Sequence, residues 1–93
     1  MAKCPVLLSK EVTIKNKLGL HARPAAMIAN LAKTATSKVW IESDDGMVDA
    51  TSVIDMLTMC CAEGAHVTVR VENQSDLDIL ESITRLVEDD FGE

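Results

Sequence analysis

The segment from His66 to Glu72 places a valine at every second position, and this alternation constrains the fold more than any other feature of the sequence. Successive side chains of a strand point to opposite faces, so Val67, Val69 and Val71 share one face and polar residues occupy the other. A strand of this kind belongs in a sheet that is covered on one face and open to water on the other.

Other parts of the chain supply further strands. Residues 11–16 alternate in the same way and predict a first strand. Residues 38–50 predict a hairpin, because Asp44, Asp45 and Gly46 form a turn signal between its two extended halves.

Three helices are predicted between and after the strands. Ala22 to Lys33 are rich in helix-forming residues, and Pro24 fits the first turn, where the missing N–H costs nothing. A short second helix is predicted from Val53 to Cys61, ended by Glu63-Gly64-Ala65. The third follows a loop at 73–75 and carries apolar residues at helical spacing: Ile79, Leu80, Ile83, Leu86, Val87 and Phe91.

The order of elements is strand, helix, strand, strand, helix, strand, helix. One-faced strands and one-faced helices bury their apolar sides against each other, and 93 residues suffice for one such core. We therefore predict a single domain over residues 1–93. Its fold class is α+β, an open-faced β-sandwich in which three helices cover one face of a four-stranded antiparallel sheet.

Composition excludes several classes of function. The net charge of −6 disfavours nucleic-acid binding, and no run of 18 apolar residues predicts a membrane span. The three cysteines lack zinc-site spacing, and their odd number fits reduced thiols, so we expect a cytoplasmic protein without a metal. No signal peptide is recognisable.

His21 is the residue most suited to covalent chemistry. Neutral imidazole is abundant near pH 7 and is nucleophilic, and the amides and dipole of a helix N-terminus favour a phosphate. Arg23 adds a planar set of donors within the first turn, and Gly19 gives the loop freedom to fold back. Spacing alone nevertheless favours a plainer interpretation, a surface histidine that weakly caps the helix.

The heptapeptide Gly-Leu-His-Ala-Arg-Pro-Ala, residues 19–25, resembles the active-site motif of the histidine-containing phosphocarriers of the bacterial phosphoenolpyruvate-dependent phosphotransferase system, the HPr family. The resemblance extends over the chain in length and element order. It implies that His21 accepts a phosphoryl group on Nδ1 from enzyme I and donates it to an enzyme IIA-type domain, while Arg23 steadies the group. The protein would then be a carrier without a cofactor, and not an enzyme.

Two branches of the family are similar to this chain. The segments 16–19 and 52–54, the acidic charge and the tail 90–93 resemble the nitrogen-related carrier, NPr, as much as the sugar carrier. The family also implies a docking surface for both partners around the first two helices, here Ala22, Ala26, Val53 and Leu57, on a monomeric protein. The branch stays open.

Ser52 lies where many HPr proteins carry a regulatory serine that an HPr kinase/phosphorylase modifies. The plainer interpretation is an N-cap, because Ser52 stands three residues before Asp55. Asp49-Ala50-Thr51 replaces the basic residue that often precedes the regulated serine. A phosphate on Ser52 would add charge beside the docking surface and weaken binding of enzyme I.

His66 is expected to be an ordinary strand residue, and Met56, Met59, Cys60 and Cys61 to fill the core or the docking surface. A regulatory binding module, controlled by phosphorylation at His21 or Ser52, is the alternative function. A hydrolytic enzyme has no support, because no paired carboxylates, metal cluster or activated nucleophile accompanies His21.

Overall fold

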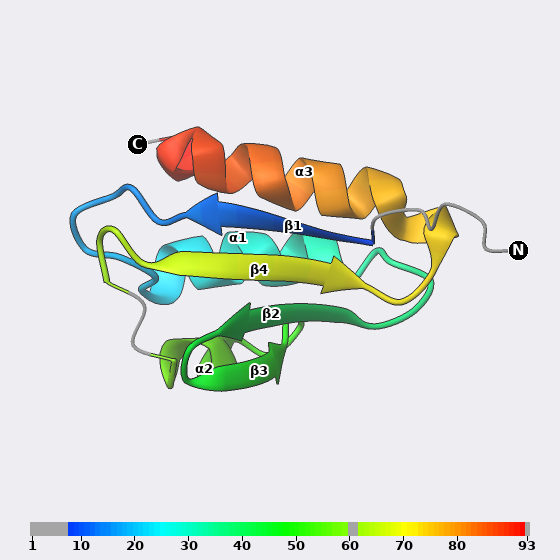
Figure 1. Ribbon diagram of the computed structural model, residues 1–93, viewed down its shortest axis with the longest axis horizontal. Helices are drawn as coiled ribbons and strands as arrows, with labels where there is room; N and C mark the ends of the chain where they lie inside the picture. The colour runs from blue at the N-terminus through cyan, green and yellow to red at the C-terminus, as the bar shows by residue number, and fades with distance from the viewer. Residues whose placement is uncertain (1–7, 60–61, 93) are drawn as a thin grey trace, which may run out of the picture.

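The computed structural model describes residues 8–59 and 62–92, which contain a four-stranded sheet with helices packed against it (Figure 1). The strands are β1 (Ser9–Thr13), β2 (Val39–Ser43), β3 (Gly46–Asp49) and β4 (His66–Val71). The helices are α1 (Ala22–Ala32), α2 (Val53–Leu57) and α3 (Leu77–Glu88), and the 3-10 turns η1 (Gln74–Asp76) and η2 (Asp90–Gly92) flank α3.

The strands pair in the order β1-β4-β2-β3, and every neighbouring pair is antiparallel. The register aligns Val12 with Val67 and Ile41 with Val69, so apolar residues of three strands lie side by side. The helices cover this apolar face, which confirms the predicted open-faced α+β fold.

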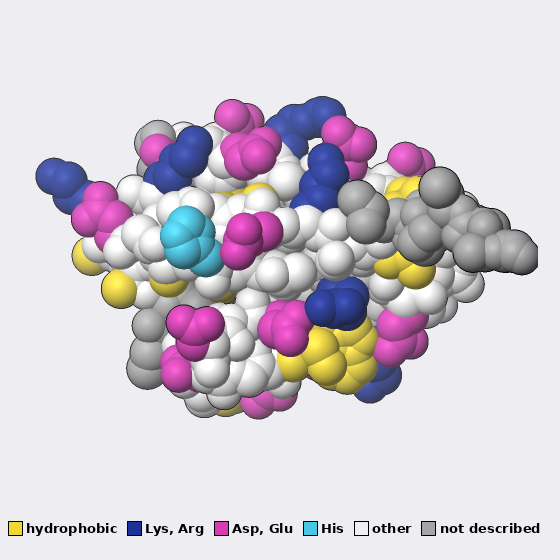
Figure 2. Space-filling view, in the orientation of Figure 1, with side chains coloured by type: hydrophobic (Ala, Val, Ile, Leu, Met, Phe, Trp, Pro, Cys, Tyr) yellow, Lys and Arg dark blue, Asp and Glu magenta, His cyan; other side chains and the backbone are white. Residues whose placement is uncertain are grey.

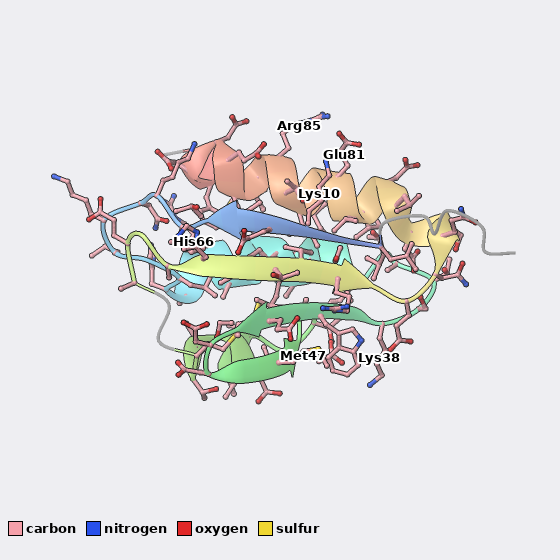
Figure 3. The ribbon with its side chains drawn as sticks, viewed as in Figure 1. Lys10, Lys38, Met47, His66, Glu81 and Arg85 are labelled. Atoms are coloured by element: carbon pink, nitrogen blue, oxygen red, sulfur yellow. The ribbon has the colours of Figure 1, made fainter. Side chains whose placement is uncertain are left out.

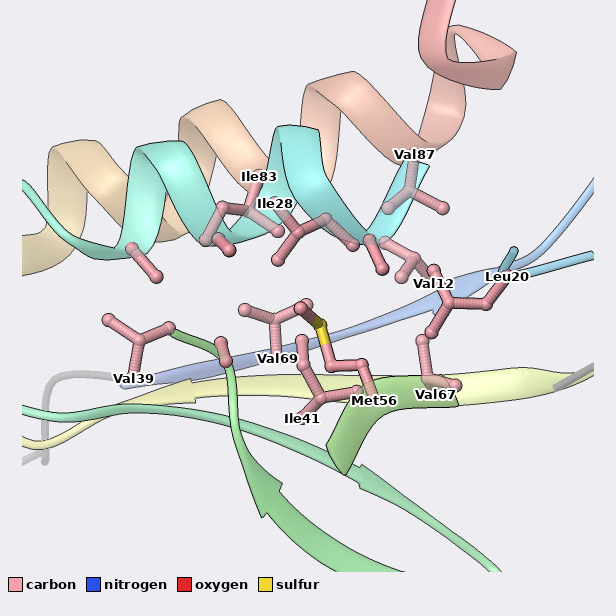
Figure 4. Close-up of a cluster of buried hydrophobic side chains, with 14 of the residues drawn as sticks. Val12, Leu20, Ile28, Val39, Ile41, Met56, Val67, Val69, Ile83 and Val87 are labelled. Carbon is pink, nitrogen blue, oxygen red and sulfur yellow. The ribbon is translucent and has the colours of Figure 1, made fainter. Parts of the chain in front are cut away.

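The core lies between the apolar face of the sheet and the helices (Figure 4). Ile28 of α1 and Ile83 of α3 are buried there against Val69 of β4, and Met56 of α2 fills the space near β2. Each fully buried aliphatic side chain contributes about 1.5–3 kcal/mol of transfer free energy.

The opposite face of the sheet is polar (Figure 2). Arg70 of β4 pairs with Glu42 of β2 at 2.7 Å, and Trp40 Nε1 donates a hydrogen bond to Glu72. Thr68, between Arg70 and His66 on β4, continues the polar row. The alternation in 66–72 therefore separates the core from the solvent as predicted.

The first strand was predicted over residues 11–16 but occupies Ser9–Thr13. The ladder ends where Thr13 meets His66, the first residue of β4. Ile14 continues the contact through two backbone bonds, from its N–H to Ala65 O at 2.8 Å and from Gly64 N–H to its carbonyl at 2.7 Å. After Ile14 the chain leaves the sheet. The alternation of apolar and polar residues therefore extends further along the sequence than the strand pairing does.

All three helices end earlier than predicted, and α1 does so by one residue, at Ala32 instead of Lys33. Helix α2 ends at Leu57, and Thr58 closes it with its hydroxyl on the Asp55 carbonyl at 2.6 Å. Met59 is nevertheless buried, as expected, whereas Cys60 and Cys61 lie outside the described residues. Helix α3 ends at Glu88, and Phe91 reaches the core from η2 with a positive φ of 59°.

Asp76 joins two distant parts of the chain, and sequence patterns did not indicate it. Its side chain is only 2% exposed, although it is charged. One carboxylate oxygen accepts bonds from the Thr36 amide (2.8 Å) and hydroxyl (3.0 Å), and the other accepts bonds from the Ser37 amide (3.0 Å) and hydroxyl (2.8 Å). The Thr36 amide above all holds the pKa of Asp76 below its usual value, against the opposing effect of burial.

Candidate functional site

A tight loop joins β1 to α1 and ends at His21. Asn16 folds its side chain into this loop, where Nδ2 donates to the Gly19 carbonyl at 2.7 Å. The Gly19 amide donates back to the Asn16 carbonyl at 3.0 Å, and Gly19 adopts a φ of +68°, which glycine accepts without strain. Leu20 is buried in the core and thereby anchors the backbone immediately before His21.

His21 is the N-cap residue of α1 and has an extended backbone, with φ −107° and ψ −170°. Its amide donates to the Gly19 carbonyl at 3.1 Å, and its carbonyl accepts the Ala25 amide at 3.0 Å. The side chain makes no hydrogen bond that caps the helix, which removes the support for the plainer capping interpretation. His21 is half-buried as a residue, and its Nε2 atom is buried.

The N-terminal end of α1 has a positive electrostatic character. The amides of Ala22 and Arg23 lie in the first turn, where no carbonyl four residues back exists within the helix, and that turn contains no acidic residue. The side chain of Arg23 is exposed in the same turn, and the loop before His21 carries the exposed Lys15 and Lys17, which line a hollow together with Glu63 and Asp90. A phosphoryl group on His21 would therefore meet donors and positive charge.

The surface beside α1 and α2 contains exposed apolar residues. Of the four docking residues implied by the family, Ala22 and Leu57 are exposed, and Ala26 and Val53 are half-buried. Two further large apolar residues that the sequence analysis did not name are also exposed, Leu18 with 76% and Ile54 with 75% of the residue surface accessible. A five-residue amphipathic helix cannot bury apolar side chains on both sides, and this was the available signal for Ile54.

Ser52 is the N-cap of α2, and its hydroxyl oxygen accepts the Asp55 amide at 3.2 Å. The turn before it is held by Asp49, whose carboxylate accepts the amide (2.8 Å) and hydroxyl (2.7 Å) of Thr51. Bonds from the Thr51 amide and hydroxyl, with a smaller effect of Lys38, lower the pKa of Asp49. Two carboxylates, Asp49 and Asp55, thus lie three residues from Ser52 on either side in sequence, and they would oppose a phosphate there.

His66 is exposed at the start of β4 (Figure 3) and, as the neighbour of the buried Val67, lies on the open face of the sheet. Its Nδ1 is 3.0 Å from the hydroxyl of Thr13, its cross-strand neighbour, as expected of an ordinary strand residue. A hollow of about 540 Å³ on the surface is lined by His66 with Glu11, Asp44 and Asp45 among others. Among residues 8–59 and 62–92, no group of three His, Cys, Asp or Glu side chains is placed to hold a metal ion.

No helix in the described parts of the chain is both long enough and apolar enough to cross a bilayer.

Comparison with known proteins identifies relatives of this arrangement. Residues 8–89 match the family model described as the PTS HPr component phosphorylation site. The phosphocarrier protein NPr of Proteus mirabilis is 34% identical over 85 residues, which cover 90% of this chain and 94% of the relative. The HPr-like protein Crh of Halalkalibacterium halodurans is 30% identical over 82 residues, 88% of this chain and 98% of the relative.

Solved structures agree with the sequence comparison. HPr from Thermoanaerobacter tengcongensis superposes with a TM-score of 0.86 at 32% identity, covering 94% of this chain and 98% of that one. A structure described as an HPr dimer from the same organism has a TM-score of 0.72 at 31% identity, with both chains fully covered. The chain therefore belongs to the HPr family of the phosphotransferase system, whose members are phosphocarriers phosphorylated on histidine and not enzymes.

Proposed function

We propose that His21 is the residue that carries the phosphoryl group, on Nδ1, from enzyme I to an enzyme IIA-type protein. The observation that supports this most is the placement of His21 as N-cap of α1, with Nε2 buried and the ring half-exposed. In the transfer, the Nδ1 lone pair forms a new P–N bond while the bond between phosphorus and the donor breaks. No water is consumed, and the reverse exchange hands the group to the acceptor.

In this proposal, the backbone amides at the N-terminal end of α1 donate hydrogen bonds to the phosphate oxygens. Their dipoles are fixed by the helix, so they need no reorganisation as negative charge arrives. Members of the family work with enzyme I and enzyme IIA components, and we propose partners of these two kinds for this chain.

Arg23 is proposed to stabilise the phosphoryl group during each transfer. We expect Arg23→Ala to slow transfer from phosphorylated enzyme I by about 10- to 100-fold while the far-ultraviolet circular dichroism spectrum stays unchanged. Arg23→Lys keeps the charge without the planar donor set and should recover only part of the rate. Rates of single-turnover transfer measure this, and a rate for Arg23→Ala equal to that of wild type removes the role.

The docking surface is proposed to contain Ile54 and Leu18 as well as the four residues implied by the family. Ile54→Lys should raise the KM of enzyme I for this carrier by about tenfold with little change in kcat. The reason is that binding would bury the lysine charge where wild type buries an apolar side chain. Met47 is 49% exposed on β3, and Met47→Lys serves as the matched control. Equal KM values for the two variants contradict the placement of the surface.

A regulatory binding module is the second candidate function. The chain is 30% identical to the HPr-like protein Crh, which is close to its 34% identity to NPr, and this similarity favours the regulatory alternative. In this alternative, phosphate on His21 or Ser52 changes the affinity for a partner. Incubation with ATP and a purified HPr kinase tests the Ser52 arm: labelling of wild type but not of Ser52→Ala supports it, and absence of label leaves Ser52 as a helix cap only.

The carrier is proposed to act in the cytoplasm as a monomer. A half-exposed His21 and exposed apolar residues nearby suit brief encounters with successive partners. The solved HPr dimer makes the oligomeric state a point to measure. Light scattering during size exclusion decides it, and a mass of twice 10.1 kDa contradicts the monomer.

A further inference from the structure

Asn16 is buried in the loop before the proposed phosphoacceptor. Among the described residues, its side chain forms no hydrogen bond to α1 or to the sheet. Only 7% of its surface is exposed. Its Nδ2 donates to the Gly19 carbonyl at 2.7 Å, and the same carbonyl accepts the His21 amide at 3.1 Å. One carbonyl oxygen thus joins the side chain of Asn16 to the backbone of His21.

This shared carbonyl fixes the peptide group between Gly19 and Leu20. Leu20 is anchored in the core, and Gly19 alone has little resistance to rotation of its peptide planes. If the Asn16 amide did not hold the carbonyl, the peptide would be free to turn and the bond to the His21 amide would be lost. The direction in which the chain enters α1, and with it the ring of His21, depends on that peptide.

A role in stability alone does not account for a buried asparagine at this position. Its Oδ1 is buried, and no described residue donates a hydrogen bond to it. Burying a polar atom in that way costs free energy, and among the hydrogen bonds of this side chain in the described residues only the Nδ2 bond opposes that cost. Exchanging the amide assignment would place an oxygen against the Gly19 carbonyl, so the donor identity of Nδ2 is chemically determined.

We propose that Asn16 is a positioning residue for phosphoryl transfer: its side-chain amide holds the Gly19 carbonyl, which holds the His21 amide and so fixes the ring for attack. The inference rests on the proposed role of His21 as the phosphoacceptor. It assigns to a loop residue a function that is exerted through the backbone at Gly19. Small displacements of a nucleophile lower transfer rates strongly, and much less so the affinity for a partner.

The test compares two variants with wild type in transfer from phosphoenolpyruvate through purified enzyme I. Asn16→Asp keeps the size of the side chain but replaces the donor with a second acceptor, and Asn16→Ala removes both. We expect each to lower kcat about tenfold with KM within about twofold of wild type. Asn73→Ala is the matched control, because Asn73 Oδ1 accepts the Ser75 amide (3.1 Å) at the opposite end of the sheet (Figure 1).

Two kinds of result overturn the inference, kinetic results on the variants and a spectroscopic result on wild type. One is a kcat for both Asn16 variants within twofold of wild type, or a loss of rate that Asn73→Ala reproduces at equal thermal stability. The other concerns wild type alone: nuclear magnetic resonance must detect the coupling across the hydrogen bond from the His21 amide to the Gly19 carbonyl, and its absence contradicts the geometry even if a variant fails to fold. Lack of label on wild type overturns the proposed function itself, which separates the two failures.

Discussion

His21→Ala will carry no phosphoryl group when it is incubated with phosphoenolpyruvate and enzyme I. Wild type should gain one acid-labile, alkali-stable phosphate, seen as a shift of the intact mass. The variant lacks the imidazole that forms the P–N bond, so labelling should fall by more than about 100-fold, to background. The fold should survive, because the side chain of His21 makes no capping bond in α1.

His66→Ala provides the matched control for this experiment. His66 is the other histidine of the chain, and it lies exposed on the open face of the sheet with its Nδ1 near the Thr13 hydroxyl. Its replacement should leave labelling unchanged. Label retained by His21→Ala, or lost in His66→Ala, would place the phosphoacceptor elsewhere and end the proposal for His21.

The sequence was most informative where one physical requirement acts on every residue of a segment. In β4 each valine must face the core and each polar residue the solvent, so a period of two specifies both the strand and its orientation. The predicted start of α1 is correct for a related reason, since Pro24 is tolerated only in the first turn. These constraints are local, and they were enough for the order of elements.

Boundaries set by distant contacts were less accessible. Phe91 matches the helical spacing of α3, yet the chain leaves the helix after Glu88 and brings the ring back to the core with a left-handed backbone. Periodicity identifies that a side chain is buried, but not by which backbone path it arrives. The same limit explains β1, whose end depends on where β4 begins.

The residues of the candidate site also fall into two groups, those with a local sequence signal and those that depend on contacts in the folded chain. His21 and Arg23 were proposed from a motif, whereas Asn16 was not, because its proposed role depends on a bond to Gly19 that forms only in the folded loop. Ile54 was missed since an apolar residue in a short helix is normally assigned to the core. A polar side chain that bridges two segments leaves no periodic signal, and Asp76 is the clearest case.

Asp76→Asn should lower the thermal stability more than any other single carboxylate replacement in the described chain. The asparagine retains one acceptor oxygen, but its amide would face the amide and hydroxyl of Ser37, which are themselves donors. The link between the segment before β2 and the start of α3 would be broken. We expect Tm at pH 7 to fall by roughly 5–10 °C, measured by circular dichroism.

The pH dependence of this loss distinguishes a charged bridge from a merely well-packed side chain. Because the pKa of Asp76 is lower in the folded protein than its usual 3.8, its stabilising contribution is complete above that value and is lost as pH falls through the folded pKa. The Tm difference between wild type and Asp76→Asn should therefore be constant from pH 7 to about pH 5 and narrow below about pH 3.8. Asp78→Asn, an exposed replacement in the first turn of α3, should shift Tm by no more than about 2 °C at either pH. A difference that stays the same at acid pH would mean that the ionised carboxylate is not what joins the two segments.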